Sequence, residues 1–230
     1  MGRQMKGLLY FYWKDLQFSL FVFWCILLSM VVVSVTLMFL FPAIEFMSFS
    51  FTAPIYVYAG IVGFLMARHT VAFGIKLGGT RKNIYMSMGI FFVILALVKS
   101  TLAAVITAGI EKFIIQDDMN FLFAHPMNIY EDTLLNRMYT DFFIILFIGV
   151  LAFFISLMFY KLGLLVTGLI MGMGLVLFMY SLFSGELITY IIDSFQNSVY
   201  IFFAQLGLLA LIAYALSWIL LRRITVVAKK

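Results

Sequence analysis

The sequence predicts an all-α polytopic membrane protein that forms a single domain over residues 1–230. Composition supports that class, because 65% of the 230 residues are apolar and 11% are charged, whereas a soluble domain averages about 25% charged residues. Uncharged stretches of about 18 residues or more, each long enough for a spanning helix, also recur along the chain. A closed membrane barrel is not expected, because barrel strands alternate apolar with polar residues and these stretches do not.

The first 15 residues predict an amphipathic helix that lies in the cytoplasmic interface of the membrane. Apolar side chains recur at helical spacing, at Met5, Leu8, Leu9, Tyr12 and Leu16. Basic side chains lie off that stripe, at Arg3, Lys6 and Lys14. The alternative is a basic flank that only orients the following helix. A cleaved signal peptide is not expected, because the apolar run that follows is too long.

Six stretches predict membrane-spanning helices. Their expected ranges are 16–41, 46–67, 84–110, 138–160, 162–183 and 199–221. At about 1.5 Å per residue, each range is long enough to cross a hydrocarbon core of about 30 Å. The fourth and fifth spans are separated only by a short turn near Lys161.

The basic residues alternate with these spans and predict the orientation of the chain. One side of the membrane receives all of the 15 Lys and Arg residues except Lys99, Lys112 and Arg137. Because Lys and Arg concentrate in cytoplasmic segments, both termini are expected in the cytoplasm. The acids agree, since Asp15 alone falls on the cytoplasmic side. The net charge of +5 follows from this topology, and we do not interpret it as nucleic-acid binding.

Three segments between the spans are long enough to carry function. Residues 68–82 form a basic cytoplasmic loop, in which glycines permit turns at the ends of a short helix. Apolar side chains within it offer a docking face: Val71, Phe73, Ile75 and Leu77. The alternative is an ordinary basic loop without a partner. On the outer side lie residues 111–137 and a semi-apolar segment, 184–198, which predicts an outer re-entrant hairpin covered by protein.

Two charged residues are expected inside the membrane, Lys99 and Asp141. A charge at mid-bilayer costs about 2.5–3.5 kcal/mol on insertion scales, so it needs a partner or a wet cavity. The expected depths of the two residues differ by roughly 12 Å at the helical rise. Lys99 therefore either faces a translocation path, pairs with an acid of the outer loops, or extends its amine to the outer headgroups.

Small residues in the fifth span predict a close helix contact. Gly168 and Gly172 form a Gly-x-x-x-Gly pair, which Gly174 extends, and such pairs let helices approach closely. The contact is either internal to the protomer or part of a dimer interface.

Motifs for enzyme chemistry are missing from the sequence. No phosphate-binding loop occurs, so ATP hydrolysis by this chain is not expected, and no zinc-protease or serine-nucleophile motif occurs either. His69 and His125 are expected on opposite sides of the membrane, where they cannot share a metal. Cys25, the single cysteine, is expected to be a small buried hydrophobe. The chain is therefore expected to bind no catalytic cofactor or metal of its own.

The residues 78–82, Gly-Gly-Thr-Arg-Lys, directly before a span, complete a layout that resembles a known family. With the basic amphipathic N-terminus, six spans and the outer hairpin, the chain resembles the membrane subunit of bacterial ABC-2 type exporters. It is similar in particular to small Gram-positive permeases such as those that export phenol-soluble modulins. The outer loop at 111–137 is longer than is usual for that family.

The resemblance implies a set of partners and roles. Two permease chains, identical or different, would pair with two cytoplasmic ABC ATPase subunits that bind ATP and Mg²⁺, in the bacterial cell membrane. The ATPase coupling loop would comprise Arg68, Val71, Phe73, Gly74, Lys76, Gly78, Gly79, Thr80, Arg81 and Lys82. The turn at Lys161 would supply a second contact, and the hairpin that carries Glu186 and Asp193 would close the path outside.

The function expected from this resemblance is export of an amphipathic or lipophilic substrate, with a peptide as the preferred class. Two alternatives remain open at the level of sequence. One is a membrane immunity or sensor subunit that transports nothing. The other is a self-sufficient secondary transporter, which requires more buried ionisable groups than Lys99 and Asp141.

Overall fold

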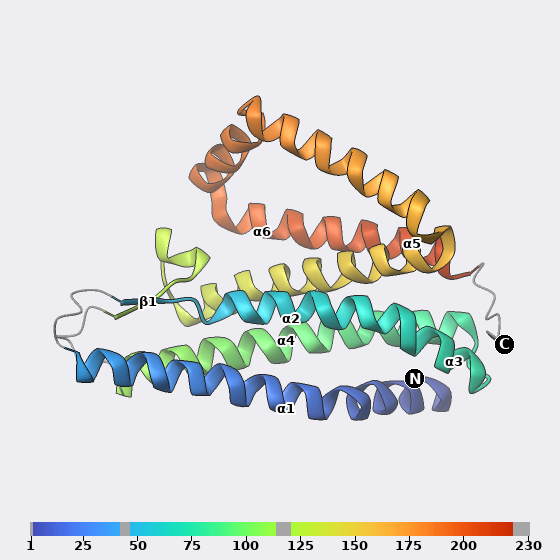
Figure 1. The fold of residues 1–230 in the computed structure, drawn as a ribbon, viewed down its shortest axis with the longest axis horizontal. Helices are drawn as coiled ribbons and strands as arrows, with labels where there is room; N and C mark the ends of the chain where they lie inside the picture. The colour runs from blue at the N-terminus through green and yellow to red at the C-terminus, as the bar shows by residue number, and fades with distance from the viewer. Residues whose placement is uncertain (1, 42–46, 114–120, 223–230) are drawn as a thin grey trace.

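The computed structural model describes residues 2–41, 47–113 and 121–222 (Figure 1). Its elements in chain order are α1 (Arg3–Leu40), β1 (Met47–Phe49), α2 (Thr52–Leu65), a π-helical turn (Met66–Thr70), α3 (Val71–Lys76), α4 (Arg81–Phe113), β2 (Phe121–Phe123), a 3-10 turn (Pro126–Ile129), α5 (Leu134–Phe183) and α6 (Glu186–Leu221).

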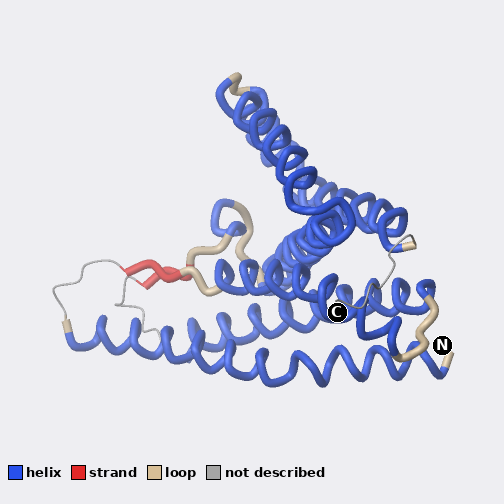
Figure 2. Tube along the Cα trace, turned by 45° about the vertical axis from the view of Figure 1, so that its right-hand side comes forward, coloured by secondary structure: helices blue, strands red, loops and turns tan. Residues whose placement is uncertain are grey.

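The helices form an elongated bundle with one arm that diverges from it (Figures 1 and 2). Within the described residues, four segments are long and apolar enough to cross a membrane: Arg3–Leu40, Arg81–Phe113, Leu134–Phe183 and Ser198–Leu221. The helix Thr52–Leu65 is apolar but shorter. Apart from the pair of short strands, the described elements are helical, so the expected all-α class is confirmed.

The two ends of the bundle have different contents (Figure 1). The first residues of α1, the helix α3, the start of α4 and the last residues of α6 lie together, and we call this the proximal end. The two strands, the end of α4 and the start of α5 lie together at the other end, which we call the distal end. Both ends of the described chain are therefore on one side of the bundle.

The helix α1 corrects the expectation of a separate interfacial helix over residues 1–15. It is one helix of 38 residues, about 57 Å long at the usual rise. The expected apolar stripe is real, but it packs on protein, since Leu8 and Tyr12 are buried. The Tyr12 hydroxyl lies 3.2 Å from Ser87 Oγ in α4. The outer face of α1 leaves Cys25 exposed, so its expected burial is also wrong.

The second expected span, 46–67, is wrong at its start. Residue 46 lies outside the described residues, and Met47–Phe49 is a strand instead of a helix. This strand pairs in parallel with β2, with Met47 opposite Phe121. The pairing joins segments far apart in sequence, so no local pattern indicates it. At its other end the helix runs beyond the expected residue 67, because α2 continues through the π-helical turn into α3.

The connection between α3 and α4 explains the Gly-Gly-Thr residues locally. Gly78 has φ +76°, and the Gly79 N–H donates to the Gly74 carbonyl at 2.9 Å, which is the Schellman ending of a helix. Thr80 Oγ1 then accepts from the Asn83 N–H at 3.3 Å and caps the start of α4. The third span, expected over 84–110, thus extends by three residues at each end, to Arg81–Phe113.

The long helix α5 changes direction at Gly163, which has φ 81° and ψ 174°. This non-helical residue divides α5 close to the turn expected near Lys161, between the ranges 138–160 and 162–183. The first part packs into the bundle, where a Cβ atom on Gly63 of α2 would lie 2.0 Å from the Gly149 carbonyl oxygen. The backbones of α2 and α5 therefore touch, and that contact requires glycine.

The second part of α5, residues 164–183, forms the arm (Figure 2). Its side chains are exposed almost throughout, with Thr167 as the buried exception. A Cβ atom on Gly168, Gly172 or Gly174 would meet nothing within 4 Å. The expectation that these glycines pack inside the protomer is therefore wrong for the described chain, and the expectation of a dimer contact stays a prediction.

The helix α6 has a break at Ser198, where φ is −170° and ψ is 110°. The part after the break matches the sixth expected span, 199–221. The part before it, Glu186 to residue 197, is a helix entered through Gly185 at φ 79°, and it occupies the segment expected as a hairpin. It begins at the tip of the arm and runs back toward the bundle (Figure 1).

Candidate functional site

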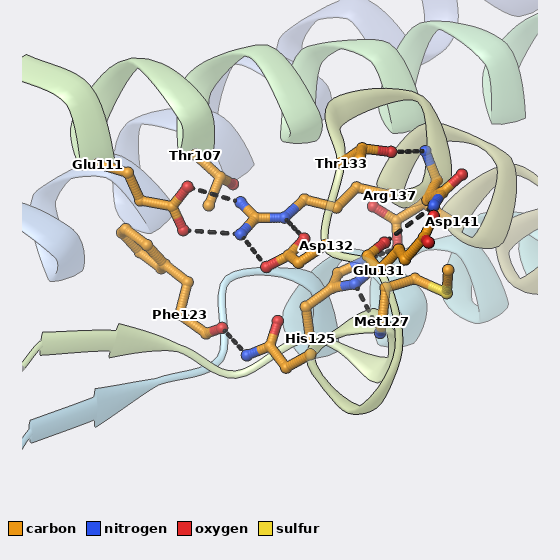
Figure 3. A network of polar contacts seen from close by, with 12 residues as sticks. Thr107, Glu111, Phe123, His125, Met127, Glu131, Asp132, Thr133, Arg137 and Asp141 are labelled. Atoms are coloured by element: carbon orange, nitrogen blue, oxygen red, sulfur yellow. Dashed lines mark hydrogen bonds and ion pairs between the residues drawn. The ribbon is translucent and has the colours of Figure 1, made fainter.

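The distal end holds a group of buried and partly exposed polar side chains that we call the distal polar cluster (Figure 3). It is made of Tyr56, Glu111, His125, Asp132, Arg137 and Asp141. The cluster joins α2, α4, α5 and the segment between α4 and α5. Of these six residues, only Asp141 was expected from the sequence to lie inside the membrane.

Arg137, near the start of α5, is the cation of the distal polar cluster and is 7% exposed. Its Nη1 and Nη2 donate to the two carboxylate oxygens of Glu111 at 3.0 and 2.8 Å. The same guanidinium donates from Nε and Nη2 to both oxygens of Asp132 at 2.5 Å. Paired bidentate contacts of this kind are the strong form of the ion pair. They tie the end of α4 to the start of α5.

His125 and Asp141 form the second half of the distal polar cluster. The Nδ1 atom of His125 accepts from the Met127 N–H at 3.0 Å, which leaves the proton of a neutral imidazole on Nε2. That Nε2 lies 3.0 Å from Asp141 Oδ1 and donates to it. The Tyr56 hydroxyl donates to the same oxygen. Asp141, which is 1% exposed, therefore receives two donors within the protein.

Local sequence explains why His125 is held in this position. His125 precedes Pro126 and caps the 3-10 turn through its own side chain. Proline in the first turn has no N–H to satisfy, so the capping bond to Met127 satisfies the next free donor. A histidine directly before a proline in a loop next to a membrane acid was the signal available in the sequence. Its partner in α5 could not be identified without the fold.

Lys99 is buried apart from the described acids and corrects one of its three expectations. It is 1% exposed, and its Nζ has no hydrogen-bond partner among the described residues. The amine lies 3.8 Å from the Tyr58 ring centroid and 4.5 Å from that of Phe23. Extension to the outer headgroups is therefore wrong, because α1 and α2 enclose the side chain. Pairing with an acid of the outer loops stays a prediction, because part of those loops lies outside the described residues, and so does a position facing a translocation path.

The predicted coupling loop lies at the proximal end, and its side chains differ in accessibility. Phe73 and Leu77 are 39% and 62% exposed, whereas Val71 is 2% exposed and belongs to the core. Lys76 is exposed beside them. Val71 is thus not available as part of the expected docking face. The side chain of Arg68 lies outside what the structure describes.

Further contacts connect the coupling loop to the rest of the proximal end. The Gln4 side-chain amide donates to the Gly78 carbonyl at 3.0 Å. Arg81 donates to the Arg222 carbonyl at the end of α6. Because the carbonyls at a helix C-terminus lack partners, an arginine there stabilises that end. The Phe11 and Phe73 rings stack at 4.3 Å between centroids. The start of α1, α3, α4 and the end of α6 therefore meet at this loop.

The remaining expected site residues belong neither to the distal polar cluster nor to the contacts of the coupling loop. Lys161 is exposed next to the break at Gly163. Glu186 and Asp193 are exposed in the first part of α6 and take part in no ion pair within the described ranges. The structure does not bring them to the distal polar cluster.

Among the residues that the structure describes, no group of three His, Cys, Asp or Glu side chains is placed to hold a metal ion. The search of family models, curated proteins and solved structures finds no match for this chain. The resemblance to ABC-2 permeases therefore stays a prediction from the residues, and the function must be argued from geometry.

Proposed function

We propose that the chain is the permease subunit of an ATP-driven exporter of the ABC-2 type, with six spans and both termini in the cytoplasm. The observation that carries the proposal is α3, a short helix at the proximal end that exposes Lys76 and part of Phe73 and is followed directly by the exposed Leu77. Exposed apolar side chains beside a basic one form the kind of surface that a soluble partner can bind. The partner would be a cytoplasmic ABC ATPase that supplies ATP binding and hydrolysis.

The connections of α3 support a mechanical role. The helix is continuous with α2 through the π-helical turn and is joined to α4 by two glycines and a cap. A force on α3 therefore acts on α2, whose backbone touches α5 at Gly63 and Gly149. At the far end of α2, Tyr56 donates to Asp141 of α5. In our proposal α2 is the lever, and the distal polar cluster is the contact that it strains or relaxes.

The arm of residues 164–183 supports the proposed pairing of two permease chains. It is an apolar helix whose exposed small residues, Gly168 and Gly172, leave room for another backbone. The proposed substrate is an amphipathic or lipophilic compound, preferably a peptide, carried outward across the cell membrane. Glu186 and Asp193 would lie at the outer exit.

Co-purification with the ATPase of a neighbouring reading frame tests this function. The double variant Lys76→Ala with Leu77→Ala should bind the ATPase at least about ten-fold more weakly, which is a loss of about 1.4 kcal/mol in binding free energy. Substrate-stimulated ATP hydrolysis should fall with it. Lys112→Ala and Leu135→Ala are the matched controls, because these exposed side chains belong to the distal end. Equal association of both pairs of variants would overturn the docking role of α3.

One observation favours a second function, proton-coupled secondary transport. The chain buries His125, Arg137 and Asp141 together, in addition to Lys99, which is more than the sequence indicated. Such intramembrane ionisable groups mark proton relays in transporters. Transport in vesicles separates the two functions. Uptake that requires ATP and survives a protonophore supports the exporter, whereas uptake that a pH gradient drives without ATPase, and that Asp141→Asn abolishes, supports the alternative.

A further inference from the structure

A cleft opens between α1 and the α2–α3 region at the proximal end. Its volume is about 590 Å³, within the range of roughly 300–1,000 Å³ typical of small-ligand sites. It is separate from the distal polar cluster and lies on the side of α3 that faces α1. It shares Phe73 with the surface proposed for the ATPase, but the proposed transport function assigns no ligand to it.

The lining of the cleft is amphipathic. Phe11 of α1 and Phe73 of α3 form an aromatic wall. Val62 of α2 belongs to the deeper wall, which is apolar. Polar atoms come from Asp15, Ser19 and Thr70. Most of the surface therefore suits a hydrocarbon chain, and only a few groups can orient a polar head.

Asp15 gives the cleft its charge. It forms no ion pair and no hydrogen bond with any other residue that the structure describes. The other described acids belong to the distal end or to the first part of α6, so Asp15 is the one carboxylate of the described proximal end. An unpaired carboxylate beside exposed aromatic faces attracts a cation, because both interact favourably with positive charge.

The position of the cleft along α1 indicates whether its ligand comes from water or from the membrane. Asp15 lies where the sequence predicts the membrane boundary, and Val62 lies deeper along α2. A molecule held here would place its head at headgroup depth and its tail in the acyl region. A ligand that already resides in the membrane fits this arrangement.

We propose that this cleft binds a single-chain amphiphile with a cationic amine head, which enters from the membrane. The ammonium group pairs with Asp15 and contacts the rings of Phe11 and Phe73. The hydrocarbon tail lies along Val62 between α1 and α2. Because Phe73 also belongs to α3, an occupied cleft holds α1 and α3 together.

Binding of radiolabelled dodecylamine to the full-length protein in phosphatidylcholine nanodiscs tests the proposal, with empty nanodiscs subtracted. We expect one saturable site per chain. Asp15→Asn should weaken binding about five-fold, as expected when a solvent-exposed ion pair worth about 1 kcal/mol is lost. Asp193→Asn is the matched control, because it makes the same change at an exposed acid in the first part of α6, away from the cleft, and its affinity should equal that of the wild type.

Competition and stability measurements complete the test. Unlabelled dodecylamine should displace the label, while dodecanol and butylamine should displace it at least about ten-fold less well. Equal displacement by dodecanol would show that the cleft does not select charge, and equal displacement by butylamine would show that the head alone binds from water. Either result overturns the proposal, as does unchanged binding by Asp15→Asn. Because Asp15 is exposed, the Asp15→Asn variant should keep the thermal unfolding midpoint of the wild type. A loss of binding in this variant then reports on the site and not on the fold.

Discussion

At the distal end, α2, α4 and α5 meet around buried charges, whereas at the proximal end α3 is joined to its neighbours by backbone caps and ring stacking. The distal contacts use Arg137 with two carboxylates and Asp141 with two donors. The proximal contacts use the Schellman ending at Gly78 and Gly79 and the stacked rings of Phe11 and Phe73. The distal end is thus stabilised by charge-assisted hydrogen bonds that require a defined geometry, and the proximal end by weaker contacts.

The difference has a mechanical meaning. A buried charge that loses its partner is costly, so the distal polar cluster has few acceptable arrangements. Caps and stacked rings each contribute about 1 kcal/mol and tolerate small displacements. The proximal end can therefore yield to a partner while the distal end switches between discrete states. Variants at the two ends test this contrast directly.

The largest expected effect is at Arg137. Arg137→Met removes a buried guanidinium that donates to both Glu111 and Asp132, which are themselves partly exposed, and we expect a loss of about 2–3 kcal/mol in the free energy of unfolding. Thermal and chemical unfolding in detergent measure it. Arg81→Met at the proximal end is the matched control, because Arg81 is exposed and contacts one carbonyl, and it should cost less than about 1 kcal/mol. Equal losses at the two positions would remove the contrast.

Next in size is the contact between α2 and α5, which in our proposal transmits motion between the ends. Gly63→Ala places a Cβ atom against the Gly149 carbonyl and should cost about 2 kcal/mol, because the helices must separate. Gly168→Ala in the arm meets nothing in the protomer and should leave monomer stability unchanged. Dimer mass after Gly168→Ile is a further measurement. A shift to monomer supports the arm as the dimer interface, and an unchanged dimer contradicts it.

Features that depend on neighbouring residues could be predicted from the sequence, whereas contacts between distant segments could not. The break at Gly163 was expected within two residues because Lys161 interrupts two apolar runs, and the apolar stripe of Leu8 and Tyr12 followed from helical spacing. The strand pair β1–β2 and the contact of His125 with Asp141 join segments that are separate in sequence. No periodicity encodes such pairs, so they appear only in the fold.

The same reasoning explains the misplaced boundary in α1. Composition marks the change from an amphipathic to an apolar segment near residue 15, but the backbone needs no break there. The tertiary contact of Tyr12 with Ser87 keeps the helix on the bundle. A hydrophobic stripe indicates which face is buried, and it does not say whether lipid or protein covers that face.

A smaller effect of opposite sign is expected at Lys99, which lies between the two ends. Its amine has ring contacts but no hydrogen-bond partner in the part of the chain that the structure describes. Lys99→Met keeps the volume and removes a buried charge, so it should raise the free energy of unfolding by about 1–2 kcal/mol. If the amine faces the translocation path, transport should fall while stability rises. A marked loss of stability would mean that the amine has a partner in the folded protein.

The smallest expected effect is at Gly78, which adopts φ +76° with open space around its Cβ position. Gly78→Ala meets no atom but must take a left-handed conformation, at a cost of about 1 kcal/mol. Gly109→Ala, in α4 and equally open, is the matched control and should be neutral or slightly stabilising. The comparison of the two ends predicts that Gly78→Ala changes ATPase stimulation and protein stability to different degrees. Since Gly78 sets the angle between α3 and α4, ATPase stimulation by substrate should fall far more than stability does. If stimulation and stability fall in proportion, the proximal end acts as part of the rigid fold, and the lever described for α2 must begin elsewhere.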